Sequence, residues 1–240
     1  MWDKEIAEAH DEVASALYAP DVLGPMVDLL AGLAGDGAAL EFAVGTGRLA
    51  LALHARGVPV TGIELSPHMV EQLRKKEGAD AVPVTIGDMT TTRVAGPFRV
   101  VYLVANTIMN VTTQDDQVAV FENAAAHLAP GGCFVLEVIV PQLRRVPPGD
   151  TARVFTMERQ HVGIETFDDL VGQIAWSHHW YDAGGRLLHH AAPYRYVWPS
   201  ELDLMARLAG LRLRERWADW RRTPFTSDSV SQVVVFEKPA

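Results

Sequence analysis

Two glycines and an acid near the start of the chain have the types and spacing needed to hold a nucleoside. Gly45 and Gly47 follow the apolar run of residues 38–42. Glycine has no Cβ and can take positive φ, so such a turn lets a ligand lie against free backbone N–H groups at the start of a helix. Glu64 follows the next apolar run, and a carboxylate accepts two ribose hydroxyls well. The alternative for Glu64 is a first-turn helix acid that interacts with the helix dipole.

Apolar runs alternate with segments of helical spacing, which predicts an α/β fold. Strands are expected at residues 38–42, 58–63, 82–86, 99–104 and 133–140, and helices from about residue 49, at 67–76 and at 114–128. Ser66 before Pro67 is a good N-cap, and Asp21 and Ser200 are the expected N-caps of helices at about 21–32 and 200–209. His127, in the last turn of its helix, is expected to be a surface cation.

Two cofactor classes fit the glycine turn. Residues 45–50, GTGRLA, match the dinucleotide fingerprint G-x-G-x-x-A, with Glu64 at a suitable distance for the ribose. The same stretch also fits E/D-x-(G/A)-x-G-x-G from Glu41, with Ala43 in place of the first glycine. That pattern resembles motif I of the class I S-adenosylmethionine (SAM)-dependent methyltransferases.

Further segments resemble the same family in the same order: GIELS at 62–66, GDM at 87–89 and LAPGG at 128–132. An NAD-dependent enzyme would explain only the glycine turn and the acid after the second strand. The resemblance implies that Asp88 accepts the adenine amine and that Met89 packs on the ring, although Gly-Asp is also a common turn pair. The cofactor-binding residues that it implies are Glu41, Ala43, Gly45, Gly47, Glu64, Leu65, Met69, Asp88, Met89, Val104 and Ala105.

The resemblance also implies a doubly wound, Rossmann-like, seven-stranded sheet whose final pair, at 211–218 and 231–237, carries an antiparallel last strand. Three units are expected: an N-terminal helical lid (1–37), a SAM-binding core (38–140 and 199–240), and an antiparallel β insertion (141–198) that covers the acceptor site. Residues 182–185 are the expected hairpin turn of that insertion. The alternatives for the insertion are packing on its neighbours or forming a dimer face.

The insertion is rich in His, Tyr, Trp and Arg, which could select an acceptor. We expect His178 or His179 to act as general base if the acceptor is a hydroxyl, Tyr18 and Asn106 to orient the acceptor, and Arg195 to bind an acceptor carboxylate. A metal site is not expected, because neighbouring histidines point to opposite faces of a strand.

Composition excludes several functions. A net charge of -9 disfavours nucleic acid as a partner, and Cys133 is the single cysteine, so no internal disulfide can form. No apolar run approaches the length of a membrane span, and no signal-peptide pattern occurs, so we expect a cytoplasmic monomer or homodimer.

The expected activity is transfer of the SAM methyl group to a nitrogen or oxygen of a small molecule, as in natural-product and amino-sugar methyltransferases. A SAM-binding protein that has lost catalysis is the alternative from another class, and an NAD-dependent oxidoreductase is a further one. A polar, acceptor-sized cavity under the insertion would favour the enzyme.

Overall fold

The computed structural model describes residues 4–142, 146–183 and 186–240. Its larger sheet contains β1 (Ala39–Phe42), β2 (Val60–Glu64), β3 (Val84–Ile86), β4 (Phe98–Leu103), β5 (Leu128–Ile139), β10 (Arg212–Trp217) and β11 (Ser231–Glu237). The strand order is β10-β11-β5-β4-β1-β2-β3. The first five strands pair in parallel, whereas β11 is antiparallel to both β5 and β10. The predicted seven-stranded, doubly wound α/β fold is therefore confirmed.

Helices cover both faces of this sheet. They are α1 (Lys4–Val13), α2 (Pro20–Ala34), α3 (Arg48–Ala55), α4 (Pro67–Leu73), α5 (Gln114–His127) and α6 (Pro199–Leu208), with 3-10 turns η1 (Ser15–Tyr18), η2 (Ala79–Ala81) and η3 (Thr107–Asn110). Along β1, Leu40 packs in the cluster that includes α5 and α6, whereas Ala39 packs in the cluster of α2, α3 and α4. The central strand is buried on both faces, so its sequence is continuously apolar except for Glu41. Among the described residues, no helix combines the length and apolarity that crossing a membrane requires.

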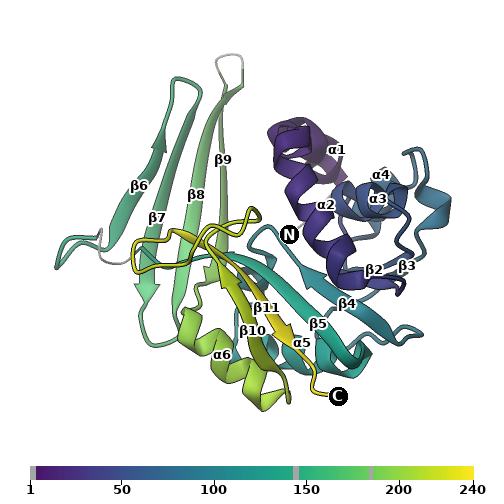
Figure 1. Cartoon of the computed structure of the whole chain (residues 1–240). Coiled ribbons are helices and arrows are strands. Elements are labelled where there is room, and N and C mark those ends of the chain that lie inside the picture. The colour runs from purple at the N-terminus through teal and green to yellow at the C-terminus, as the bar shows by residue number, and fades with distance from the viewer. Residues whose placement is uncertain (1–3, 143–145, 184–185) are drawn as a thin grey trace.

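A second sheet is formed by β6 (Ala152–Met157), β7 (His161–Asp169), β8 (Ile174–Ala183) and β9 (Arg186–Arg195). Its strands follow one another in antiparallel order. It stands beside the larger sheet, separate from the helical layer that holds α1 (Figure 1). Ala183 pairs with Arg186, which confirms the predicted hairpin; Gly184 and Gly185 of its turn lie outside the described residues. The strand-rich sequence after β5 thus forms a sheet of its own.

Two of the three predicted capping residues do not cap their helices. Ser66 caps α4 as predicted, accepting the Met69 N–H at 3.4 Å. The predictions for Asp21 and Ser200 were wrong: α2 begins at Pro20 and α6 at Pro199, and neither N-cap residue makes a side-chain cap bond. Proline fits the first helical position because its φ is already helical and it has no N–H to satisfy there. It therefore places the helix start one residue ahead of each polar side chain.

His127 is buried, not the predicted surface cation. Its Nε2 atom accepts the Val94 N–H at 3.0 Å, so that nitrogen carries no proton. Its Nδ1 atom lies 2.8 Å from the Asn123 carbonyl and donates to it. Burial lowers the pKa of His127, which keeps the ring neutral. The helical period gave its place in the last turn of α5 but not the loop that covers it.

Candidate functional site

The glycine turn between β1 and α3 is held by the acid that ends β2. Gly45 and Gly47 have φ of 59° and 81°. The Gly45 N–H donates to Glu64 Oε2 at 2.8 Å, and the Ser66 N–H donates to Glu64 Oε1 at 2.9 Å. Each carboxylate oxygen can accept a second hydrogen bond, so Glu64 retains capacity for ribose hydroxyls. The backbone has thus oriented this carboxylate before any ligand arrives.

Two cavities adjoin at the carboxyl ends of β1 and β2. The glycine-turn cavity, of about 240 Å³, is lined by the predicted residues Glu41, Ala43, Gly45, Glu64, Met69, Val104 and Ala105. The Asp88 cavity, of about 330 Å³, is lined by the predicted residues Ala43, Glu64, Leu65, Asp88 and Met89. Glu64 lines both cavities and therefore lies at their junction. A ribose joining one group in each cavity would meet this acid.

Gly47 is the one predicted cofactor residue that lines neither cavity. A Cβ at this position would approach the Leu73 side chain to 2.9 Å. Gly47 therefore lets α3 start in close contact with α4, in addition to supplying the positive φ of the turn. Its role in this structure is backbone geometry and packing.

Glu41 places a buried acid in the wall of the glycine-turn cavity. It is 3% exposed, and the Tyr102 hydroxyl donates to its Oε2 atom at 3.0 Å. Burial raises the pKa of Glu41 to about 8, although the Tyr102 hydrogen bond and Arg48 oppose the rise. A buried acid of this kind favours a cationic group beside it, because a positive charge would stabilise its ionised form. The amino group of a bound amino acid moiety has that charge.

The Asp88 cavity combines apolar walls with one acid. Asp88 Oδ1 accepts the Thr90 N–H at 2.8 Å and the Thr90 hydroxyl at 2.7 Å, which orients the carboxylate. Ile63, Leu65, Met89 and Val111 also line this cavity. Apolar side chains around a single fixed acceptor suit a flat heteroaromatic ring that carries an amine. With Glu64 at the junction and Glu41 in the other cavity, the acceptors fit the amine, ribose and amino acid parts of SAM in order.

Residues that sequence reasoning missed close the glycine-turn cavity. His10 and Leu17, from the N-terminal segment, line it together with Thr46. Asp11 ties that segment to the turn: it accepts the Thr46 hydroxyl at 2.6 Å and forms an ion pair with Lys76. These residues belong to no common motif. Thr46 alone could have been found from the sequence, because it lies between the two glycines of the turn.

The predicted catalytic residues lie outside both cavities. His178 lies beside the stacked pair of Trp180 and His189 on one face of β8, with ring centroids 5.8 and 5.7 Å from its own. His179 lies on the other face, where its Nδ1 atom is 2.8 Å from His161 Nε2. Burial and the neighbouring His161 lower the pKa of His179. His178 and His179 therefore face opposite sides of the strand, as predicted. In the described part of the chain, no group of three or more His, Cys, Asp or Glu side chains is arranged to hold a metal ion.

Tyr18 and Asn106 support the cavity walls rather than line them. The Tyr18 hydroxyl donates to Asp11 at 2.6 Å and lies 3.3 Å from the Thr46 hydroxyl. Asn106 has φ of 61°, and its Oδ1 atom accepts the Ile139 N–H at 2.7 Å. Both side chains are therefore engaged in tying segments together beside the glycine-turn cavity.

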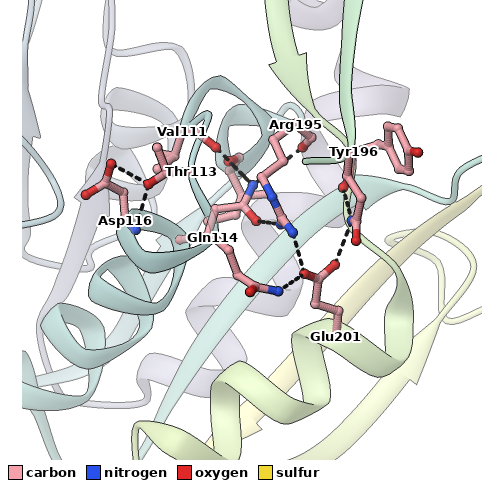
Figure 2. Close-up of polar contacts among 10 residues, drawn as sticks. Val111, Thr113, Gln114, Asp116, Arg195, Tyr196 and Glu201 are labelled. Carbon is pink, nitrogen blue, oxygen red and sulfur yellow. Dashed lines mark hydrogen bonds and ion pairs between the residues drawn. The ribbon is translucent and has the colours of Figure 1, made fainter. Parts of the chain in front are cut away.

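Arg195 does not face an acceptor. It is 3% exposed, and its guanidinium donates to Gln117 at 2.5 Å and to Glu201 at 2.6 Å. Figure 2 shows Arg195 and Glu201 facing each other between the end of the second sheet and α6. The expectation that Arg195 binds an acceptor carboxylate is therefore wrong, because Glu201 already occupies that role.

A third cavity, the insertion cavity, lies where the second sheet meets the end of β5. It measures about 310 Å³ and is lined by Met109, Ile139 and Gln142 on the core side and by Arg153, Glu165, Phe167, Tyr194 and Tyr196 on the insertion side. Glu165 is nearly buried and accepts Arg153 Nη2 at 2.5 Å. Burial, together with Glu165, raises the pKa of Tyr194 well above its ordinary value. The cavity is thus aromatic, with its one acid paired.

Comparison with known proteins agrees with this geometry. Residues 39–132 match the family model described as a methyltransferase domain. The structure of the CcbJ methyltransferase from Streptomyces caelestis is 33% identical, with a TM-score of 0.81 over 90% of this chain and 89% of that one. The cypemycin N-terminal methyltransferase of a Streptomyces species is 27% identical over 245 residues, which cover 99% of this chain and 98% of the relative.

A third relative matches over a shorter stretch. The dTDP-4-amino-2,3,4,6-tetradeoxy-D-glucose N,N-dimethyltransferase of Saccharopolyspora spinosa is 37% identical over 98 residues, 41% of this chain and 39% of the relative. The motif order, the seven-stranded sheet and the acidic double cavity all agree with these matches. The chain belongs to the SAM-dependent methyltransferases.

Proposed function

We propose that this methyltransferase acts on a nitrogen atom of a small molecule. The names of two relatives specify nitrogen: one methylates the N-terminus of cypemycin, and the other is an N,N-dimethyltransferase of an amino sugar nucleotide. One named acceptor is thus an N-terminus and the other is an amino sugar nucleotide, which supports a small-molecule or short-peptide amine here.

The observation that carries the proposal is the scarcity of unpaired bases among the described residues that line the insertion cavity. Among the described residues that line the three cavities, His10 is the one imidazole. Glu165 is already paired with Arg153, and the raised pKa of Tyr194 keeps its hydroxyl protonated. A hydroxyl acceptor has a pKa far above 7 and benefits from a general base, whereas an amine needs only its neutral form. The site therefore suits an amine better than an alcohol.

The insertion cavity is the proposed place for the body of the acceptor. It shares the η3 segment with the cofactor side: Met109 lines the insertion cavity, while Thr107 and Asn110 line both of the other cavities. An acceptor packed on Phe167, Tyr194 and Tyr196 would need to reach past η3 toward the glycine-turn cavity. Second-sheet residues would thereby cover the acceptor, and α1 would act as the lid over the cofactor.

SAM, when bound, supplies a methyl group already activated on a sulfonium. The protein's contribution is to hold that sulfonium and the amine in line and to exclude water, since orientation supplies a large part of the barrier reduction in such transfers. Glu41, Glu64 and Asp88 fix the cofactor by their acceptor oxygens. The transfer itself needs no base, because the amine attacks in its neutral form and its product carries the resulting positive charge as an ammonium ion.

Paired acceptors test the proposal. The protein is incubated with methyl-labelled SAM and one acceptor at a time. The two amine acceptors are a 4-amino sugar nucleotide and a short peptide with a free N-terminus. Their controls are the matching 4-hydroxy sugar nucleotide and the N-acetylated peptide. We expect the label in at least one of the two amine acceptors and in neither control. Mass spectrometry should place the methyl group on nitrogen. The rate should rise with pH through the pKa of the acceptor amine. Labelling of the hydroxyl sugar in place of its amino twin would contradict the proposal.

A further inference from the structure

A short stretch of backbone separates the cofactor cavities from the insertion cavity. This dividing wall consists of η3 and the next residue, 107–111. Thr107 and Asn110 line both cofactor cavities, and Val111 lines the Asp88 cavity. Met109, from the same turn, lines the insertion cavity. Any displacement of this backbone therefore changes the shape of the cofactor site and of the insertion cavity together.

One buried amide holds the wall from behind. Gln117, in the first half of α5, is fully buried. Its Nε2 atom donates to the carbonyls of Ile108 and Val111, each at 3.1 Å. These two acceptors bracket the wall, so a single side chain fixes both of its ends. A carboxylate of the same shape at this position could not donate to either carbonyl.

The other end of the Gln117 amide is held from the second sheet. Gln117 Oε1 accepts Arg195 Nη1 at 2.5 Å, and Arg195 is the last residue of β9. This contact fixes which way the amide points, because the oxygen must face the guanidinium and the nitrogen then faces the wall. The contact spans 78 positions of the sequence and joins the insertion to α5.

Arg195 is in turn fixed by a polar cluster around Glu201 of α6. Its Nη2 atom donates to Glu201 Oε1 at 2.6 Å, and the same carboxylate accepts Gln114 at 2.7 Å and Gln173 at 2.9 Å (Figure 2). Gln173 also donates to the carbonyl of Tyr196, whose side chain lines the insertion cavity. Burial alone would raise the pKa of Glu201, but hydrogen bonds from Gln173, Arg195 and Gln114 lower it, so the carboxylate stays ionised against Arg195. The guanidinium therefore has both of its partners at fixed places.

We propose that Arg195 and Gln117 are positioning residues that act as one unit: Arg195 orients the Gln117 amide, and Gln117 holds the wall at 107–111 in the shape that the cofactor requires. Neither side chain lines a cofactor cavity. Residues at the base of the second sheet therefore set the affinity for the cofactor, although their side chains do not line either cofactor cavity. This inference rests on SAM dependence and is independent of which acceptor the enzyme uses.

The test measures binding of S-adenosylhomocysteine by calorimetry to the full chain. Gln117→Glu keeps the side-chain shape and the acceptor for the Arg195 guanidinium. It removes both donations to the wall, together with the longer donation of Nε2 to the Arg195 carbonyl at 3.4 Å. Arg195→Lys keeps the charge beside Glu201 but loses the fork that reaches two acceptors at once. We expect each variant to bind at least fivefold more weakly, and the double variant to bind no more weakly than the weaker single variant, because both changes break one chain of contacts.

Gln114→Ala is the matched control. It loses one of the hydrogen bonds to Glu201 but leaves the Arg195–Gln117 contact and both donations to the wall in place, so its affinity should stay within twofold of the parent. Thermal unfolding confirms that each variant is folded at the assay temperature, and if Gln117→Glu does not fold, Arg195→Lys carries the test with the same threshold. Unchanged affinity in folded single variants, or losses that add in the double variant, would overturn the proposal. Its failure would leave the amine assay unaffected, because no acceptor is used.

Discussion

Replacing Glu41 with Gln should change how stability depends on pH. Burial raises the pKa of Glu41 from an ordinary 4.5 to about 8. Between those two pH values the folded protein keeps a proton that the unfolded chain has released. The free energy of unfolding should therefore fall as pH rises through this window, and the whole effect should be absent below pH 4.5.

The size of the effect follows from the same two values. Each pH unit in the window corresponds to about 1.4 kcal/mol. Relative to acid pH, the proton held by Glu41 therefore lowers the free energy of unfolding by less than about 1 kcal/mol at pH 5 and by about 3 kcal/mol at pH 7. Gln has the shape of the protonated acid, and its oxygen can still accept the Tyr102 hydroxyl, which lies 3.0 Å from Glu41. The variant should thus gain about 2–3 kcal/mol on the parent between pH 5 and pH 7.

Urea unfolding of Glu41→Gln and of the parent at a series of pH values measures this gain. Any fixed penalty from the new amide group is present at every pH, so it cancels in the comparison between pH values. Curves of unfolding free energy that converge at acid pH and separate toward pH 8 are expected. Parallel curves would refute the reasoning, since they would show that Glu41 ionises in the folded protein as it does in the unfolded chain.

Three further substitutions test separate parts of the site. Asp11→Asn should speed S-adenosylhomocysteine dissociation severalfold in surface plasmon resonance, because it weakens the contacts of Asp11 with Thr46 and Lys76. Hydrogen bonds from Lys76 and other partners hold the pKa of Asp11 well below 3.8 against the effect of burial, so the increase in dissociation rate should be the same from pH 6 to pH 8. An unchanged dissociation rate would contradict this role of Asp11. Gly47→Ala should lower the free energy of unfolding by about 2–4 kcal/mol in chemical denaturation, from positive φ and the approach to Leu73; a loss under 1 kcal/mol would argue against that packing role. His178→Ala and His179→Ala should each keep methyl transfer to an accepted amine within twofold, and a tenfold loss in either would restore it as a base.

The residues that the motifs single out for the cofactor line adjoining cavities because they are local to strand ends. Gly45 and Asp88 follow the strands β1 and β3, and Glu64 ends β2, so these parallel-paired strands bring the three residues to a common edge. The comparisons confirm the cofactor and the fold that these residues imply. Two helix starts were misplaced because proline at the first helical position outweighs a neighbouring polar side chain as a start signal.

The acceptor side was harder to predict from the sequence. Alternation along β8 showed that His178 and His179 face opposite ways, but it carries no information on how far along the second sheet the cavities extend. The partners of Arg195 were equally hidden, since Gln117 lies 78 positions away and carries no motif. Asp11 and Thr46 meet over 35 positions for the same reason. Contacts of this kind depend on how two sheets and a helix pack, which residue spacing does not encode.

The most direct test of the cofactor site is calorimetric titration of the parent and of Glu64→Gln with S-adenosylhomocysteine and, separately, with NAD. Glu64 lies at the junction of both cavities, and loss of a charged hydrogen bond to a ribose costs about 1.5–3 kcal/mol, so the variant should bind S-adenosylhomocysteine about 10–150-fold more weakly. The parent should bind S-adenosylhomocysteine in the micromolar range and NAD not measurably. Equal affinity of parent and variant for S-adenosylhomocysteine would contradict the assignment of the two adjoining cavities to SAM. Binding of NAD in place of S-adenosylhomocysteine would contradict it as well.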